Sequence, residues 1–199
     1  VEQIHAEGRV VFGVAPSAIA ASVLTVEMGV RADTIDKLLA EHRTGHPKPM
    51  FDLPAGTTVI VDEAGMLATA KLAELIRLAE DRSWRVALVG DPLQFSAVGR
   101  GGMFGMIVDT HGGIELDHVH RFTNDWERTT SLQLRRGDPA VADTYHAHGR
   151  LHGGTVEQME RGAVAAWWRH WQAGESVLLM APSNDTVDRL NQRTQQRRI

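Results

Sequence analysis

Three short apolar runs, each followed by polar residues, constrain the fold of this chain more than any other feature. They span residues 10–15, 57–61 and 85–89, and helical patterns separate them. Uninterrupted apolar runs of this length are typical of strands covered on both faces, as in parallel sheets. Strands that alternate with helices along the chain indicate an α/β fold. We therefore predict a parallel sheet flanked by helices.

The first predicted helix follows the first apolar run. Ile19, Val23 and Val26 keep helical spacing along it. Ser17 is a suitable N-terminal cap for this helix, and Gly29 a suitable stop.

The remaining elements are predicted from the same kinds of pattern. The glycine-rich segment 99–113 is typical of a surface connection, and we place a domain junction at its end, between residues 1–112 and 113–199. Helices are predicted near residues 34–43, 72–79, 125–136, 139–148, 156–171 and at the end of the chain, and further strands at 114–119 and 176–181.

Composition excludes several classes of protein. With 199 residues, of which 43% are hydrophobic, the chain can bury one sizeable core or two small ones. It has no cysteine, which excludes disulfides and thiolate metal sites. The net charge of −4 means that any contact with nucleic acid must be local. No leader or long apolar run is visible, so we expect a cytoplasmic protein, and we expect both ends of the chain to be cut.

Two acids, Asp62 and Glu63, directly follow the second apolar run. Open α/β sheets bind ligands at the carboxyl ends of their strands. One carboxylate can hold magnesium there while its neighbour activates water for phosphoryl transfer. The alternative is a strand that ends in an ordinary charged turn.

A second polar cluster follows the third apolar run, with Gly90, Asp91 and Gln94. Gly90 permits a tight turn, and the Gln94 amide can hydrogen-bond a γ-phosphate or its attacking water. The alternative is an ordinary turn between a strand and a helix.

The two clusters, DEAG and GDPLQ, resemble in order and spacing motifs II and III of superfamily 1 helicases. Overall the chain is most similar to RecD-like helicases, and in particular to the helicase region of TraI- and TrwC-type conjugative relaxases. Four further segments carry the likeness: VFGVAPSAIAASVL (motif Ia), DTIDKLL (a DNA-contacting motif), ELDHVHRF (motif IV) and LLMAPSNDTVDRLNQR (the second lobe).

The resemblance implies a RecA-like fold of the P-loop NTPase type, with ATP and Mg²⁺ as cofactors. Residues 1–112 would form the first RecA-like lobe, and residues 113–199 would begin a second. No stretch matches the phosphate-binding pattern G-x-x-x-x-G-K-[ST], so the Walker A loop is missing from this sequence. The arginine of motif VI is missing too.

The resemblance also implies roles for single residues. Asp62 would hold magnesium, Glu63 would activate water, Gln94 would sense the γ-phosphate and Arg121 would act as an arginine finger across the cleft between lobes. The predicted nucleotide-binding positions are Asp62, Gly90 and Asp91.

Single-stranded DNA is the partner that the resemblance implies. Pro16, Ser17 and Thr34 match positions where relatives contact the strand. Relatives often carry His where this chain has Asp36, and Leu where it has Phe95. A simple helix cap is the competing interpretation of Ser17.

Two further groups of residues have structural and DNA-binding interpretations. Helical spacing favours core packing for the tryptophans over an aromatic DNA platform. The arginines are expected on a solvated helix face rather than on phosphate. These groups are Trp167, Trp168 and Trp171, and Arg189, Arg193 and Arg197.

Together these features predict part of a motor that hydrolyses ATP to move along single-stranded DNA, 5′ to 3′ as the resemblance implies, in contact with conjugation machinery. The chain alone is expected to be inactive, because the phosphate-binding loop is absent. Two alternatives remain: an ATPase that is not a translocase, and a degenerate lobe that binds DNA or protein without catalysis.

Overall fold

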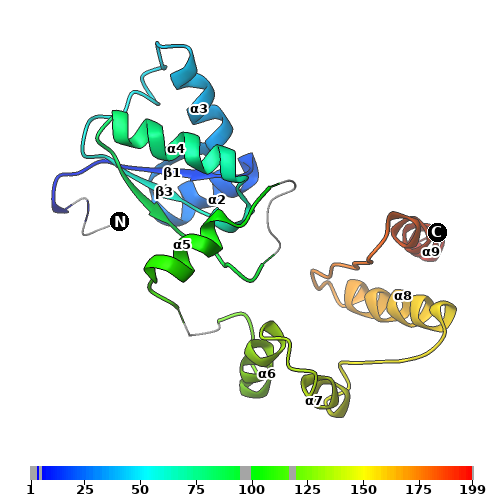
Figure 1. Cartoon of the computed structure of the whole chain (residues 1–199). Coiled ribbons are helices and arrows are strands. Elements are labelled where there is room, and N and C mark those ends of the chain that lie inside the picture. The colour runs from blue at the N-terminus through cyan, green and yellow to red at the C-terminus, as the bar shows by residue number, and fades with distance from the viewer. Residues whose placement is uncertain (1–3, 5, 95–99, 117–119, 199) are drawn as a thin grey trace. The chain divides into compact units, whose positions relative to one another are not determined.

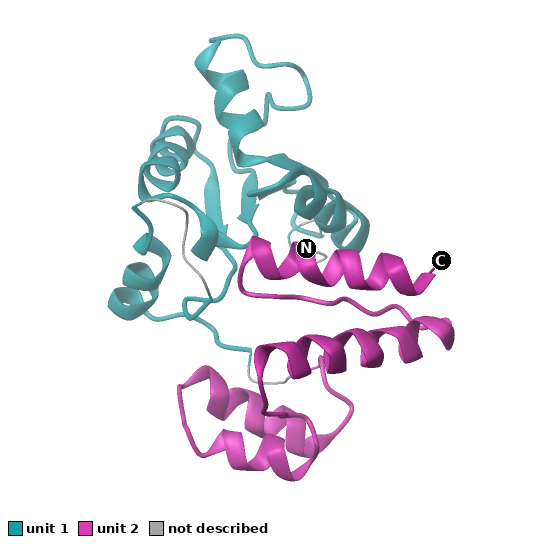
Figure 2. Ribbon diagram, turned by 90° about the vertical axis from the view of Figure 1, so that its right-hand side faces the viewer, with its two compact units in different colours: residues 1–117 teal, residues 118–199 magenta. Residues whose placement is uncertain are grey.

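The computed structural model describes residues 4, 6–94, 100–116 and 120–198 (Figure 1). It divides into two compact units, residues 1–117 and 118–199, which Figure 2 draws in different colours. Each unit is described by itself below.

The first unit contains a parallel sheet of four strands, in the order β2-β1-β3-β4. The strands are β1 (Val11–Ala15), β2 (Arg31–Thr34), β3 (Thr58–Val61) and β4 (Arg85–Leu88). The predicted α/β class is confirmed, and three of the four strands lie within the predicted apolar runs. Strand β2 was not predicted, because it is short, largely polar and lies at the edge of the sheet, where no apolar run is required.

In its described part, the first unit also contains the helices α2 to α5 and one short 3₁₀ turn. They are α2 (Ala18–Met28), α3 (Ile35–Arg43), η1 (Ala64–Met66), α4 (Thr69–Asp81) and α5 (Met103–His111).

The main core lies between one face of the sheet and the helices α3 and α4. Alternate residues of the central strands point into it, which follows from the two-residue period of a strand. Its fully buried side chains include Phe12, Val14, Val59, Val61, Ile35, Leu38, Leu39, Leu72 and Leu75.

Helix α2 packs closely against β1 and β2. A Cβ placed on Gly13 would lie 2.5 Å from Leu24 Cδ2, so the glycine makes room for the helix. The predicted helix and its ends at Ser17 and Gly29 are confirmed. However, Ile19 and Val26 are 81% and 80% exposed, and the buried residues of α2 are Ala21 and Leu24.

The prediction of a surface connection over residues 99–113 was wrong, because α5 lies within it. Phe104 is buried in the main core, and Met103, Ile107 and Val108 pack against that core. These apolar residues recur at helical spacing, and their burial outweighs the low helix propensity of the neighbouring glycines.

The second unit is built from helices in its described part. These are α6 (Asp125–Arg135), α7 (Val141–Ala147), α8 (Val156–Gln172) and α9 (Asn184–Arg198). Helix α6 packs with α7, and α8 packs with α9. Among the described residues, no helix is both long and apolar enough to cross a membrane.

The two strands predicted for this part of the chain are not formed in its described residues. Residues 114–116 and 176–181 are irregular, and residues 117–119 lie outside the described part. The apolar run 176–181 has no neighbouring strand, and its Leu178 and Met180 are 79% and 77% exposed. A strand needs a partner for its backbone hydrogen bonds, so the apolar pattern alone does not produce one.

A buried carboxylate joins α8 to α9. Glu160 is only 6% exposed, and it accepts hydrogen bonds from Arg189 at 2.7 and 3.0 Å. Arg193 lies 3.5 Å from the other oxygen of Glu160. Arg189 is exposed as expected and Arg193 is half-buried, but both also pair with Glu160 and so link α8 to α9.

The tryptophans of α8 form one ring cluster. Trp171 stacks on Trp167 and Trp168, with ring centroids 6.0 and 5.1 Å apart. Trp167 and Trp168 are half-buried, whereas Trp171 is 43% exposed. The Arg198 Cζ lies over the Trp171 ring, 5.3 Å from the ring centroid. Core packing thus describes the first two rings better than the third.

Candidate functional site

The predicted site residues of the first unit follow the carboxyl ends of its four strands. The strands are parallel and in register, with Ala15 opposite Thr34, Val14 opposite Val61, and Val61 opposite Leu88. All four carboxyl ends therefore lie along one edge of the sheet, the edge that runs across the strands. In strand order this edge carries Thr34, then Pro16 and Ser17, then Asp62 and Glu63, and last Gly90, Asp91 and Gln94.

The two acids lie in the turn that follows β3. The Asp62 amide donates to the Val14 carbonyl at 2.9 Å, which continues the pairing of β3 with β1. The Asp62 carboxylate accepts a hydrogen bond from the Glu63 amide at 3.0 Å. Glu63 has a left-handed backbone, with φ of 51°, which is uncommon for a residue other than glycine. This conformation turns the chain sharply after the strand.

Both acidic side chains are half-buried, and neither takes part in an ion pair within the described residues. Half-buried carboxylates without a cation are the oxygen ligands that Mg²⁺ prefers. No group of three or more His, Asp or Glu side chains in the described part gathers into a metal site. The acids therefore fit a magnesium ion that takes its other ligands from water and phosphate.

Two glycines without side chains allow the acidic turn to pack closely against the turn that follows β4. The Ala64 amide donates to the Val89 carbonyl at 2.9 Å. A Cβ on Gly90 would lie 3.0 Å from the Ala64 nitrogen, and a Cβ on Gly65 would lie 3.0 Å from the Asp91 carbonyl oxygen. The DEAG and GDPLQ motifs are thus in direct backbone contact. Sequence reasoning gave Gly90 a role in a tight turn and in nucleotide binding but missed Gly65, although a glycine two residues after Glu63 was the available signal.

The turn after β4 is held by Asp91. Its carboxylate accepts from the Leu93 amide at 2.9 Å, and its carbonyl accepts from the Gln94 amide at 3.3 Å. The Gln94 side chain is exposed, and Phe95 lies outside the described residues. The Gln94 side chain is therefore open to solvent, in a turn whose backbone contacts the acidic turn.

Two hydroxyl residues at the same edge cap the helices α2 and α3. Ser17 Oγ accepts from the Ala20 amide, and Thr34 Oγ1 accepts from the Lys37 amide, both at 3.2 Å. The cap interpretation of Ser17 is therefore confirmed. A cap does not remove the other amides of a first helical turn, which remain suited to bind phosphate. Ser17 is exposed and Thr34 half-buried.

Arg121 belongs to the second unit, where its side chain is exposed. It is therefore not a member of the strand-end cluster, the group of predicted site residues at the carboxyl ends of the strands in the first unit. Its role as an arginine finger stays a prediction.

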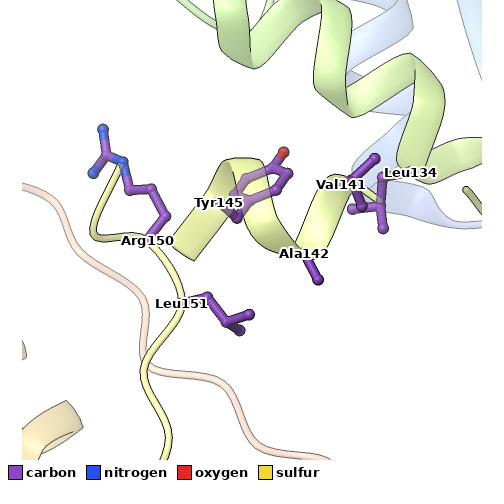
Figure 3. Close-up of a pocket in the computed structure, with 6 residues that line it drawn as sticks. All are labelled: Leu134, Val141, Ala142, Tyr145, Arg150 and Leu151. Carbon is purple, nitrogen blue, oxygen red and sulfur yellow. The ribbon is translucent and has the colours of Figure 1, made fainter. Parts of the chain in front are cut away.

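The second unit has a hollow of about 290 Å³ between α6 and α7 (Figure 3). Its lining is mostly apolar, and it contains none of the predicted site residues. The lining residues are Leu134, Val141, Ala142, Tyr145, Arg150 and Leu151. It has neither the acids nor the amides that phosphoryl chemistry requires, so the strand-end cluster remains the candidate site.

Comparison with known families identifies the class to which this fold and site belong. The family model of the AAA domain matches residues 1–156. The chain therefore belongs to the AAA domain family.

Three proteins of conjugal transfer are similar to the chain over most of its length. A probable conjugal transfer protein TraA of Sinorhizobium fredii is 30% identical over 193 residues, which cover 96% of this chain and 17% of that protein. Conjugal transfer proteins TraA of Agrobacterium fabrum and Rhizobium radiobacter are 32% and 31% identical over 187 residues, 92% of this chain and 16% of each protein. The resemblance to conjugative proteins is thereby confirmed, and the chain spans about one sixth of the length of these relatives.

Proposed function

We propose that the chain is part of an ATP-dependent motor that moves along single-stranded DNA, within a longer cytoplasmic protein of conjugal transfer. The observation that carries the proposal is the backbone contact between the DEAG and GDPLQ turns. In this contact the turn that contains Asp62 and Glu63 packs against the turn that contains Gln94. An acid pair beside a neutral amide, at the strand ends of a parallel sheet, suits phosphoryl transfer.

In this proposal Asp62 would hold Mg²⁺, and Glu63 would orient and deprotonate the attacking water. The ion, when bound with ATP, neutralises charge that develops on the phosphates. Gln94 hydrogen-bonds the γ-phosphate or the water, and Gly90 and Asp91 shape the turn that positions it. The phosphate-binding loop and the arginine of motif VI come from other parts of the longer protein.

DNA binds, in the proposal, at the other half of the same edge. Ser17 and Thr34 cap two neighbouring helices there, so first-turn amides and hydroxyls are available to phosphates. Such contacts carry no sequence information, which suits a motor that moves along any strand. The direction, 5′ to 3′, rests on the likeness to conjugative relaxases alone.

The second unit begins, in the proposal, a second RecA-like lobe that carries Arg121 as its finger. A helix, an apolar run at 176–181 and a further helix follow one another there, as in an α/β unit. Neighbouring strands from the longer protein would pair with the apolar run and cover Leu178 and Met180.

The test is ATP hydrolysis by the full-length protein with and without single-stranded DNA. Wild type is expected to be strongly stimulated by DNA. The DNA-stimulated rate of ATP hydrolysis is expected to be about 10²- to 10⁴-fold lower in the Glu63→Gln variant, the usual range for removal of a general base. Glu80→Gln changes an exposed acid on α4 and should keep the rate. Hydrolysis that does not respond to DNA would favour an ATPase that is not a translocase, and its absence would favour a degenerate lobe.

A further inference from the structure

Two ion pairs join the neighbouring helices α3 and α4. Lys71 Nζ lies 2.8 Å from Asp36 Oδ1. Arg43 donates two hydrogen bonds to Glu74, at 2.6 and 2.7 Å, in the paired geometry that fixes orientation best. The hydrogen bonds from Arg43 also lower the pKa of Glu74 below its ordinary value.

The Asp36–Lys71 pair connects the starts of the two helices. Asp36 lies in the first turn of α3, two residues after Thr34, and Lys71 lies in the first turn of α4. Helix α4 follows the acidic turn, separated from Glu63 by the short turn η1 and two further residues. One ion pair therefore links α3, which Thr34 caps, to α4, which follows the acidic turn in the sequence.

The start of α4 is also tied to the chain that returns from the turn after β4. The Thr69 amide donates to the Arg100 carbonyl at 2.9 Å, and Thr69 Oγ1 donates to the Gly101 carbonyl at 3.3 Å. The first turn of α4 thus contacts the return segment from the GDPLQ turn as well as following the DEAG turn.

The two helices also share one core. Leu38 and Leu39 of α3 and Leu72 and Leu75 of α4 belong to the same buried cluster, each at most 2% exposed. Packed helices move as a unit, because interiors are dense and deform little. A displacement at either end is therefore transmitted to the other helix.

We infer that the Asp36–Lys71 ion pair is a positioning link that couples DNA binding at the start of α3 to ATP hydrolysis at the acidic turn that precedes α4. The inference rests on the proposed function and adds a route of regulation to it. Asp36 is 64% exposed and Lys71 35%, and exposed pairs of this kind contribute little to stability, so their loss should alter coupling more than folding.

Charge exchange in the full-length protein tests the inference. The variants are Asp36→Lys, Lys71→Asp and the double exchange, and the readout is the ratio of ATP hydrolysis at saturating DNA to hydrolysis without DNA. Each single exchange is expected to lower this ratio by about twofold to fivefold, the range that one exposed ion pair supports. The double exchange restores attraction and is expected to return the ratio towards wild type.

Saturating DNA separates coupling from affinity, which is measured alongside by titration with a labelled oligonucleotide. Glu157→Lys disrupts an ion pair with Arg161 on α8, in which the acid is as exposed as Asp36, and is expected to leave the ratio unchanged. Asp36→Asn removes the attraction without adding repulsion, keeps folding undisturbed and is expected to give a smaller loss.

The inference would be overturned if the losses of the two single exchanges simply added in the double exchange. It would also be overturned if the ratio of hydrolysis with DNA to hydrolysis without DNA were unchanged in every variant. Either result would leave the proposed motor function intact. A wild type whose hydrolysis does not respond to DNA would overturn the proposed function and the inference together.

Discussion

The carbonyl oxygen of Asp91 lies 3.0 Å from the position that a Cβ on Gly65 would occupy, so the turns after β3 and β4 touch through their backbones. Gly90 meets the Ala64 amide in the same way, at 3.0 Å. No larger residue fits at either position without movement of the backbone. The candidate site therefore depends on these two glycines as much as on its acids.

Gly90→Ala is expected to destabilise the protein by about 1–3 kcal/mol, since its Cβ would meet backbone atoms rather than a flexible side chain. It should also lower ATP hydrolysis, because the two turns would be forced apart. Denaturant unfolding and the hydrolysis rate check these effects. Gly105→Ala is the matched control, because its Cβ would find its nearest neighbour at 3.9 Å in a helix where alanine is favoured. Equal stability of both variants would show that the turns are not in contact.

Helix α2 provides a second prediction, which concerns its orientation. Leu24→Ala is expected to cost about 2–5 kcal/mol, because Leu24 is buried against Gly13. Ile19→Ala should change the free energy of unfolding by less than about 0.5 kcal/mol, as is usual for exposed positions. The same unfolding measurement on both variants checks the orientation. A larger loss at Ile19 than at Leu24 would mean that the helix presents its other face to the sheet.

Thr34 allows its two proposed roles to be separated. Thr34→Asp retains a good N-terminal cap for α3 and should preserve stability, but it places a negative charge where a phosphate is proposed to bind. The affinity for single-stranded DNA is expected to fall by at least about tenfold, from loss of the contact and repulsion together. Thr34→Ser, which keeps the hydroxyl, should bind like wild type. Unaltered affinity in Thr34→Asp would remove Thr34 from the DNA interface.

The Glu160 cluster predicts a dependence of stability on pH. The hydrogen bonds from Arg189 lower the pKa of Glu160 below its ordinary value near 4.5, against the opposing effect of burial. A carboxylate whose pKa is lower in the folded state contributes stability above its unfolded pKa, and this contribution is lost as the pH falls through the folded pKa.

We therefore expect Glu160→Gln to have a lower Tm than wild type at pH 7. This difference in Tm is expected to become smaller below about pH 4.5. Thermal unfolding across this range is the measurement, with Glu157→Gln as the control on the same helix. A difference in Tm between Glu160→Gln and wild type that stays constant down to acidic pH would show that the Glu160 charge is not what joins α8 to α9.

Sequence patterns predict the parts of this fold that local physics determines. The strands β1, β3 and β4 are apolar runs, and Ser17 and Gly29 end α2 as their backbone preferences require. Strand β2 carries no such pattern, because an edge strand of four residues needs little apolar character.

The site itself is only partly accessible from sequence. The acids and Gln94 are predicted from where the strands end, and the alternation of strands and helices brings those ends together. The contacts of Gly65 with Asp91 and of Glu160 with Arg189 join distant segments, so spacing along the chain does not reveal them. Arg189 is exposed as predicted, but its pairing with Glu160 was not predicted.

The central claim is that this chain belongs to a motor that moves along DNA. The most direct test is displacement of a labelled strand by the full-length protein, with ATP and Mg²⁺, from duplexes that carry either a 5′ or a 3′ single-stranded tail. We predict displacement from the 5′-tailed duplex in wild type and in Glu80→Gln, and none in Glu63→Gln. Displacement that persists in Glu63→Gln, or ATP hydrolysis without displacement from either duplex, would contradict the account.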